Sequence, residues 1–246
     1  SKKSKVNDLI TLYDFLRRPI SGLARGGMER NYPYYGAAAL MDYVDNYIFE
    51  GIYGLIGEDG TVMDEDGYPT MQYVWGKFWV NNHAHIFQGK NGYSTEIIYL
   101  LLKNTVVQNT VTGAVQLKIA QKNLRNLSVL VPTDENLREI DAVVQTFFKY
   151  IRENCDQDLN LKSLSYEFYM NPYYFSIFFK QKSGMNFKDY LIEVRMKKAM
   201  DILLQKPDIK LQELSNMVGY RDTKTFSERF KQYYGQSPKN YKKSVH

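Results

Sequence analysis

The stretch from residue 219 to residue 238 reads Gly-Tyr-Arg-Asp-Thr-Lys-Thr-Phe-Ser-Glu-Arg-Phe-Lys-Gln-Tyr-Tyr-Gly-Gln-Ser-Pro. Asp222 suits the N-cap of a helix, because its carboxylate can accept hydrogen bonds from first-turn amides that lack a partner. Phe226, Phe230 and Tyr233 follow at helical spacing, so we expect them to form one buried apolar face. The stretch therefore predicts a turn and then a capped amphipathic helix.

A shorter helix is expected directly before this one. Leu211, Leu214 and Val218 recur at helical spacing and end near Gly219. Gly235 closes the second helix, since glycine readily adopts the left-handed conformation that ends a helix. A helix, a sharp turn containing glycine and a second helix with a polar, basic face form a helix-turn-helix.

The composition is that of a folded protein with room for one large core or two ordinary ones. The chain has 246 residues, of which 44% are hydrophobic and 24% charged. No apolar run approaches the roughly 20 residues that span a bilayer, and no apolar segment follows the basic N-terminus as in a secretory signal. Cys155 is the only cysteine, which excludes an internal disulfide and favours the reducing cytoplasm.

Charge is divided unevenly along the chain. Residues 1–135 hold 13 Lys and Arg against 14 Asp and Glu, whereas residues 136–246 hold 19 against 13. A basic half that carries a helix-turn-helix is typical of proteins that bind the phosphate backbone of nucleic acid. The alternative is a basic surface that is only solvated.

The N-terminal half alternates short apolar runs with glycine-containing turns. Residues 1–12 are mainly polar and are expected to form a frayed arm. One helix is expected at 94–103, capped by Ser94. Strands are predicted at Ile52–Ile56, Gln72–Val74, Phe78–Val80 and His85–Phe87. These elements predict a mixed α+β domain.

Residues from Leu12 to Pro132 resemble the target recognition domain of type I restriction-modification specificity subunits. Four blocks carry the resemblance: Tyr32-Pro33-Tyr34-Tyr35-Gly36-Ala37, Gly57-Glu58-Asp59-Gly60, Gly76-Lys77-Phe78-Trp79-Val80-Asn81-Asn82-His83-Ala84-His85, and Thr112-Gly113-Ala114-Val115-Gln116-Leu117-Lys118-Ile119-Ala120-Gln121-Lys122-Asn123-Leu124. The resemblance implies a domain that reads double-stranded DNA and leaves cutting and methylation to partner subunits. Such subunits usually have two recognition domains, where this chain has one. The family often has Arg at Glu58 and Asn at Ala120.

Candidate catalytic and metal sites in this half are weak. His83 and His85 are expected on one face of a strand, but two ligands do not complete a zinc site. The acidic residues between Asp59 and Asp66 lack the spacing of a calcium loop and are interpreted as turn residues. No phosphate-binding glycine motif and no nucleophile elbow occurs. We therefore predict no catalytic residue, no cofactor, no metal and no enzymatic activity.

Residues 136–246 are expected to form an all-α domain in which almost every segment is a helix. A helix capped by Thr133 runs to about Glu153 and is a boundary element that could belong to either half. The stretch from 161 to 184 repeats the helix-turn-helix pattern, with Asn171 and Pro172 opening its second helix. A long helix at 187–205 joins the two units.

This arrangement resembles the DNA-binding domain of the AraC/XylS family of transcription regulators, from about Val143 to Lys243. The resemblance is carried by the stretch from 161 to 184, by Arg195-Met196-Lys197-Lys198-Ala199, and by the residues from Val218 to Pro238. It implies two recognition helices that enter successive major-groove segments on one face of DNA, about 34 Å apart.

Positions on the outer faces of these two helices are the candidate DNA contacts. On the first helix they are Tyr173, Ser176, Ile177 and Lys180; on the second they are Thr223, Lys224, Ser227, Glu228 and Lys231. The family often has Arg at Ile177, so we expect the second helix to carry more of the hydrogen-bonded readout. Arg195, Lys197 and Lys198 are expected to hold the two units together or to touch phosphate.

The sequence therefore predicts two domains, a target-recognition-like α+β domain at 1–135 and an all-α double helix-turn-helix domain at 136–246. The favoured function is that of a cytoplasmic, bacterial, AraC-type transcription regulator that binds double-stranded DNA, with RNA polymerase or a second copy of the chain as further partners and no membrane. One alternative is the specificity component of a type I restriction-modification system, partnered by a methyltransferase subunit. In another, the N-terminal domain senses a ligand or mediates dimerisation. A rearranged or engineered fusion is the fourth interpretation.

Overall fold

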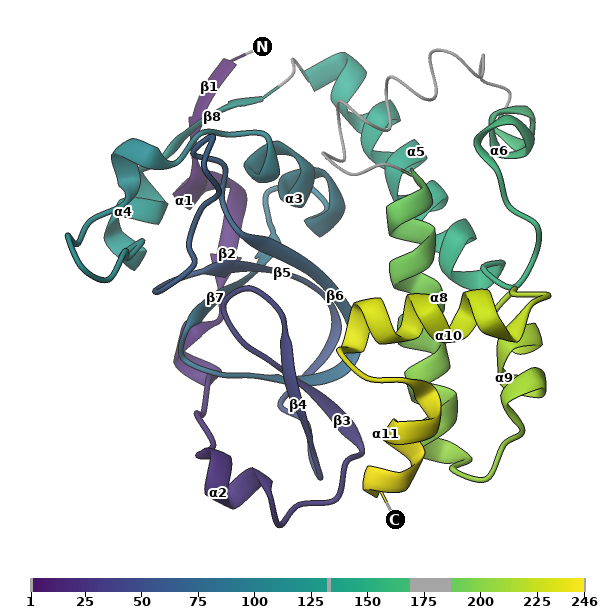
Figure 1. The fold of residues 1–246 in the computed structure, drawn as a ribbon. Coiled ribbons are helices and arrows are strands. Elements are labelled where there is room, and N and C mark those ends of the chain that lie inside the picture. Colours follow the sequence, from purple (N-terminus) through teal and green to yellow (C-terminus); the bar gives the residue numbers. More distant parts are fainter. Residues whose placement is uncertain (1, 132–133, 169–186, 246) are drawn as a thin grey trace. The chain divides into compact units, whose positions relative to one another are not determined.

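The computed structural model describes residues 2–131, 134–168 and 187–245 (Figure 1). The chain forms two compact units, Ser1–Gln145 and Thr146–His246. The border between them falls inside a single helix, α5 (Asp134–Glu153). The division expected between residues 135 and 136 stays a prediction.

The N-terminal unit is built on a six-stranded mixed sheet. Its strand order is β2-β7-β5-β6-β3-β4, and its neighbours are antiparallel except for the parallel pair β3 and β6. The strands are β2 (Ile10–Leu12), β3 (Tyr32–Tyr35), β4 (Leu40–Val44), β5 (Phe49–Gly57), β6 (Met71–Val80) and β7 (Ala84–Gly89). The four expected strands are confirmed, and the two at 72–74 and 78–80 are parts of the one strand β6.

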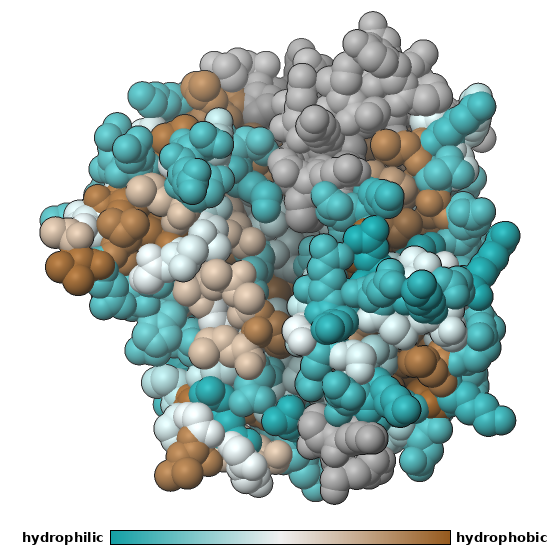
Figure 2. All heavy atoms as spheres, in the orientation of Figure 1, coloured by the Kyte–Doolittle hydropathy of each residue, from teal (hydrophilic) through white to brown (hydrophobic). Residues whose placement is uncertain are grey.

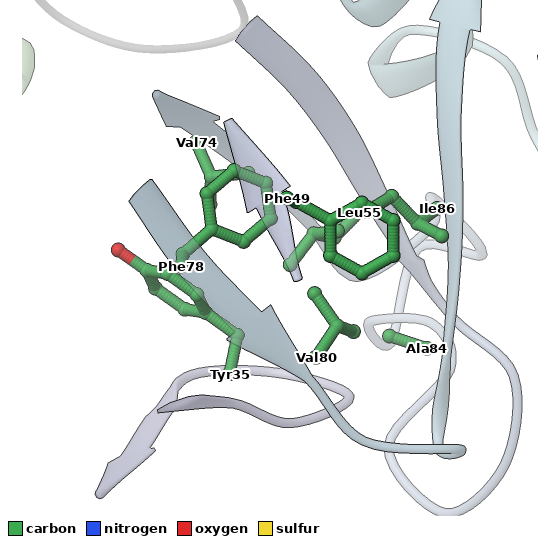
Figure 3. Close-up of a cluster of buried hydrophobic side chains, with 8 residues drawn as sticks. All are labelled: Tyr35, Phe49, Leu55, Val74, Phe78, Val80, Ala84 and Ile86. Carbon is green, nitrogen blue, oxygen red and sulfur yellow. The ribbon is translucent and has the colours of Figure 1, made fainter. Parts of the chain in front are cut away.

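Aromatic and branched side chains from this sheet form a closely packed core (Figure 3). Phe49 and Phe78 stack with their ring centroids 5.5 Å apart, and Tyr35 meets Phe78 edge-on at 5.9 Å. The predicted helix is α3 (Thr95–Lys103), which packs against β5, β6 and β7. The Ser94 hydroxyl accepts a hydrogen bond from the amide of Ile97 at 3.1 Å, which confirms the predicted cap.

The expectation of a frayed N-terminal arm is wrong. Residues 2–12 form β1 (Lys2–Lys5), α1 (Val6–Leu9) and β2, and β1 pairs with β8 (Ser128–Val131) in a second, two-stranded sheet. Apolar side chains within this polar stretch anchor it, since Val6, Leu9 and Ile10 are all buried. The partner strand lies more than a hundred residues away, so local sequence gave no sign of the pairing.

Short helical segments complete the unit. They are η1 (Asp14–Leu16), α2 (Gly22–Arg25), η2 (Gln108–Thr110) and α4 (Gln121–Asn126). Ala120 occupies the N-cap position of α4 and has no side chain that could accept a hydrogen bond there.

Helix α5 is fastened to the N-terminal unit through the start of α3. The Asp141 carboxylate accepts hydrogen bonds from the Ser94 amide at 2.9 Å and from the Ser94 hydroxyl. Farther along, Val144, Phe147 and Ile151 are buried, as the apolar spacing predicts for this part of the helix.

The described residues of the C-terminal unit form helices joined by short loops, with no strand among them. Besides α5, the described helices are α6 (Leu161–Glu167), α8 (Phe187–Gln205), α9 (Leu211–Met217), α10 (Thr223–Tyr234) and α11 (Pro238–Val245). The long joining helix expected at 187–205 is confirmed as α8, which packs against α9 and α10. Across the residues described, no helix has the length and apolar character needed to cross a membrane.

Candidate nucleic-acid interface

Helix α10 begins at a cap that three hydrogen bonds hold in place. The Asp222 carboxylate accepts from the Lys224 amide at 3.2 Å, from the Thr225 amide at 2.8 Å and from the Thr225 hydroxyl at 2.6 Å. The Thr225 hydroxyl, followed by the two amides, holds the pKa of Asp222 below its usual range. Gly235 ends the helix with φ of 76°, and its amide donates to the Lys231 carbonyl. Both predicted ends are confirmed.

The turn before α10 requires glycine. Gly219 has φ of 79°, and a Cβ there would lie 2.8 Å from the Cys155 carbonyl oxygen and 2.8 Å from Arg195 Nη2. Arg195 donates through Nε to that same carbonyl at 2.7 Å and through Nη2 to the Gln157 carbonyl at 2.8 Å. Its guanidinium also lies 5.1 Å from the centroid of the Tyr220 ring. Arg195 therefore fixes the loop after α5 against the turn that leads into α10.

The neighbouring lysines of α8 pair with acidic groups. Lys197 lies 2.9 Å from Glu193, and Lys198 lies 3.3 Å from Asp156. The Lys198 contact joins α8 to the loop before α6. Arg195 and Lys198 thus hold the loop after α5 against α8. Their expected role between the two helix-turn-helix motifs or at phosphate stays a prediction.

One face of α10 is buried against the rest of its unit. Phe226 and Phe230 are fully buried, with ring centroids 5.8 Å apart. The Tyr234 ring lies 4.7 Å from that of Phe230, and its hydroxyl donates to the Met196 carbonyl of α8 at 3.2 Å. Tyr233 is 39% exposed, so its predicted place on the buried face is wrong. Helical spacing permits either tyrosine there, and the contact with α8 selects Tyr234.

Of the five predicted contact positions on α10, three are exposed and two are half-buried. Lys224, Glu228 and Lys231 are exposed, and none of them forms an ion pair with any residue that the structure describes. Thr223 and Ser227 are half-buried, and the Ser227 hydroxyl donates to the Thr223 carbonyl at 2.7 Å. Figure 2 shows hydrophilic side chains over the face of α10 turned to the viewer. The outer face of α10 is therefore polar, charged and exposed to solvent.

The four candidate contacts of the first helix-turn-helix lie outside the described residues. These are Tyr173, Ser176, Ile177 and Lys180. They remain predictions, as does the opening of that helix at Asn171 and Pro172.

The helix before each predicted recognition helix is built in the same way. Leu164 and Ser165 are buried in α6, and the Ser165 hydroxyl donates to the Lys162 carbonyl at 2.8 Å. Leu214 and Ser215 are buried in α9, where the Ser215 hydroxyl donates to the Gln212 carbonyl at 3.0 Å. The described parts of the two helix-turn-helix motifs therefore share a buried Leu-Ser pair on a first helix of the same length.

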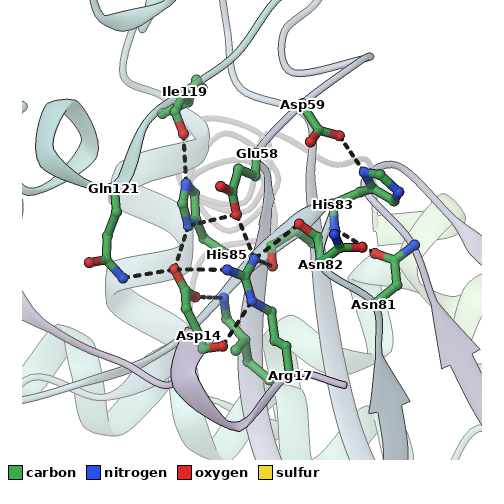
Figure 4. A network of polar contacts seen from close by, with 12 residues as sticks. Asp14, Arg17, Glu58, Asp59, Asn81, Asn82, His83, His85, Ile119 and Gln121 are labelled. Atoms are coloured by element: carbon green, nitrogen blue, oxygen red, sulfur yellow. Dashed lines mark hydrogen bonds and ion pairs between the residues drawn. The ribbon is translucent and has the colours of Figure 1, made fainter. Parts of the chain in front are cut away.

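A network of charged residues lies within the N-terminal unit (Figure 4). His85 Nδ1 lies 2.6 Å from an Asp14 carboxylate oxygen, and His85 Nε2 lies 2.7 Å from the Ile119 carbonyl oxygen. A carbonyl oxygen and a carboxylate both accept hydrogen bonds, so each ring nitrogen faces an acceptor. The His85 ring is therefore held at both of its nitrogens. A Glu58 carboxylate oxygen lies 3.6 Å from His85 Nδ1.

Arg17 completes the network at Glu58. Its Nη1 atom lies 2.6 Å from the Glu58 carboxylate and donates to the Ala84 carbonyl at 2.6 Å. Burial acts to raise the pKa of Asp14, but the hydrogen bond and charge of His85, the Ile86 amide and Arg17 outweigh it and lower the pKa. Glu58 is therefore an internal partner of Arg17.

His83 and His85 do not share a strand face. His83 precedes β7, has a half-exposed side chain, and lies 2.5 Å from Asp59. Asp14, Glu58 and His85 do bring potential ligand atoms within 4.8 Å of one another. However, both His85 nitrogens already face acceptors and Arg17 places a positive charge beside Glu58. The geometry suits an internal charge network better than a cation site.

Two family models match the chain, and they divide it between them. Residues 2–161 match the type I restriction modification DNA specificity domain, and residues 164–244 match a helix-turn-helix domain. The first match begins at β1 and includes all of α5. The N-terminal residues thus belong to the matched domain.

Two known proteins each resemble about half of this chain. A putative type I restriction enzyme specificity subunit of Haemophilus influenzae is 31% identical over 127 residues, which are 52% of this chain and 32% of that protein. The Msm operon regulatory protein of Streptococcus mutans is 29% identical over 112 residues, which are 46% of this chain and 40% of that protein. The chain therefore spans less than half the length of either relative.

A solved structure supports the fold of the N-terminal part. The S subunit of a type I restriction-modification system from M. genitalium aligns with 63% of this chain and 40% of its own, with a TM-score of 0.50 and 14% identity. The first family model covers more than half of the chain. The chain belongs to the type I restriction modification DNA specificity domain family, and its C-terminal region is a helix-turn-helix domain of the AraC type.

Proposed function

We propose that this chain is a sequence-specific, double-stranded DNA-binding transcription regulator whose helix α10 reads the major groove. The observation that carries the proposal is the division of α10 into two faces. Phe226 and Phe230 fix one face in the core, while the exposed charges of Lys224, Glu228 and Lys231 occupy the other. A rigid helix with an unpaired polar face is the element that a helix-turn-helix inserts into DNA.

The side chains on that face have complementary chemistry for base edges. Lysine donates to the acceptors of guanine, and glutamate accepts from the amino group of cytosine. In this role, Lys224 and Lys231 bind guanine or the adjoining phosphates, and Glu228 binds cytosine. The Ser227 hydroxyl has its hydrogen engaged with Thr223, so it serves as an acceptor. The proposal assigns no chemical step to the chain.

The N-terminal unit adds a second DNA contact in this account. Its family match supports this role, because the matched domain is described as a DNA specificity domain. The same match favours one competing function, the specificity component of a type I restriction-modification system. That function requires a methyltransferase subunit as partner, whereas a regulator works with RNA polymerase, as a single copy or a homodimer, in the cytoplasm.

Two experiments separate these functions. Duplexes selected from a random pool by the intact chain are footprinted with the intact chain and with residues 146–246. A longer footprint from the intact chain supports DNA contact by the N-terminal unit, and equal footprints contradict it. Purification of the tagged chain from its native host tests the partner. Recovery of a methyltransferase subunit in constant ratio would replace the regulator with the specificity component.

A further inference from the structure

A basic pocket in the N-terminal unit adjoins the network of Figure 4 at Gln121, which lines the pocket and donates to the Asp14 carboxylate at 2.9 Å. Figure 1 shows α1 beside α4, close to β1 and β8. Residues of β1, α1 and α4 line the pocket, which has a volume of about 410 Å³. The residues that decide its chemistry are Lys5, Asn7, Asp8, Lys122, Arg125 and Asn126. Three cations thus surround a pocket that has one carboxylate in its lining.

Neutral groups hold two of these cations in position. Lys5 Nζ donates to the Asn126 carbonyl at 2.7 Å, and Arg125 Nη1 donates to the Asn7 side-chain oxygen at 2.8 Å. A neutral acceptor orients a cation without cancelling its charge. Among the residues that the structure describes, no carboxylate lies within 4.0 Å of the charged atoms of Lys5, Lys122 or Arg125. The positive charge of the pocket is therefore uncompensated by ion pairing.

The backbone around the pocket fixes the spacing of these groups. Lys122 and Arg125 are three residues apart on α4, so their side chains lie on the same side of that helix. Lys5 of β1 is paired with Ser128, the first residue of β8, and β8 comes directly after α4 in the chain. An arginine fork and two ammonium groups around one pocket match the tetrahedral oxygens of a phosphate.

We propose that this pocket binds one phosphate group of the DNA backbone. The inference rests on the proposed DNA-binding function and locates a contact that the N-terminal unit makes. Arg125 contributes paired N–H donors, Lys122 contributes a mobile ammonium group, and Lys5 closes the pocket from β1. A backbone phosphate carries no sequence information, so the pocket sets affinity and register while other groups read bases.

The test uses three variants of the intact chain. They are the single variant Lys122→Gln, the double variant Lys122→Gln/Arg125→Gln, and the charge-preserving variant Lys122→Arg. The DNA probe is a duplex that the wild-type chain selects, titrated at several salt concentrations. We expect the double variant to bind about five- to tenfold more weakly at low salt and to reduce the slope of log affinity against log salt by about one. The selected sequence stays the same, and Lys122→Arg keeps wild-type binding because it keeps the charge.

Lys77→Gln is the matched control, because it removes the same charge from β6 and does not line the pocket. It should leave the salt slope within error of the wild type. Arg125→Gln also removes the bond to Asn7, so each variant is checked by thermal unfolding. Lys122→Gln removes no side-chain hydrogen bond among the residues described, so this single variant tests the charge by itself. We expect it to lower the affinity for DNA by about two- to fivefold.

Unchanged affinity and slope in both glutamine variants, with wild-type DNA binding intact, would overturn the pocket assignment. Failure of the wild-type chain to prefer any duplex is a separate result, and it would overturn the proposed function itself. Calorimetric titration with inorganic phosphate distinguishes the source of the phosphate. The proposal would be contradicted if Lys122→Gln abolished the binding of inorganic phosphate and left the affinity for DNA unchanged. The pocket would then be a site for a free anion.

Discussion

At the level of single residues, Ala120 leaves the amides at the start of α4 without a side-chain acceptor. Asn is among the best N-cap residues. We expect Ala120→Asn to raise the free energy of unfolding by about 1 kcal/mol. Both tryptophans of the chain, Trp75 and Trp79, lie on β6, so their fluorescence in a denaturant titration reports on this unit.

Ala120→Ser should stabilise in the same way, and Ala120→Val should not. Equal midpoints for Asn and Val would show that capping does not limit the stability of α4.

Asp14 links the stability of the N-terminal unit to pH. Its folded pKa lies below the ordinary value of 3.8, so the unfolded chain binds the proton more readily. The stabilisation is complete above about pH 3.8 and is lost as the pH falls through the lower, folded pKa. Tryptophan fluorescence from pH 7 to pH 2 should show this loss at the acid end.

Asp14→Asn should remove that acid dependence and cost about 3 kcal/mol at pH 7, because Arg17 loses a buried counter-charge. A variant that keeps wild-type stability at pH 7 would contradict the charge network.

At the level of elements, Gly219 and Gly235 frame α10 with the same backbone conformation in different surroundings. Both have positive φ, but only at Gly219 would a Cβ meet other atoms within 3 Å. We expect Gly219→Ala to destabilise the C-terminal unit by about 3 kcal/mol and Gly235→Ala by about 1 kcal/mol. Circular dichroism at 222 nm measures the helix loss, while tryptophan fluorescence should not change in either variant.

The comparison between the two glycines separates the cost of backbone strain, which both share, from the cost of steric contacts, which only Gly219 has. Equal losses for both variants would mean that the packing of Arg195 and Cys155 against the turn adds nothing to the backbone strain.

How far the sequence predicts these elements depends on where their determinants lie. Asp222, Gly235 and the aromatic spacing are local, and they predicted α10 with both of its ends. The choice of Tyr234 over Tyr233 depends on α8, and the pairing of β1 with β8 joins the two ends of the N-terminal unit. Neither feature can be predicted from the local sequence pattern.

The same reason explains which site residues the sequence missed. Lys122 and Arg125 could have been noted as an i, i+3 pair of cations on a short helix. Their proximity to Lys5 could not be predicted, because residues 1–12 were expected to form a frayed arm, and only the fold brings Lys5 to α4.

At the level of the whole molecule, two DNA-related domains lie in one chain. The specificity-domain match ends at residue 161, and the helix-turn-helix match begins at residue 164. Helix α5 has buried side chains on both sides of the border between the two units, since Asp141 meets Ser94 and Phe147 meets Phe168. The covalent link between the domains is therefore itself a packed helix, and each domain uses part of it.

The most direct test of the central claim is the affinity of the intact chain for a selected duplex and for a base-scrambled duplex of equal length at one salt concentration. Sequence-specific reading by α10 predicts a preference of about a thousandfold or more for the selected duplex. Lys224→Ala should reduce that preference by about five- to a hundredfold, whereas Lys239→Ala, an exposed lysine of α11, should leave it unchanged. Equal affinity for both duplexes, or an equal effect of the two alanine variants, would contradict the account.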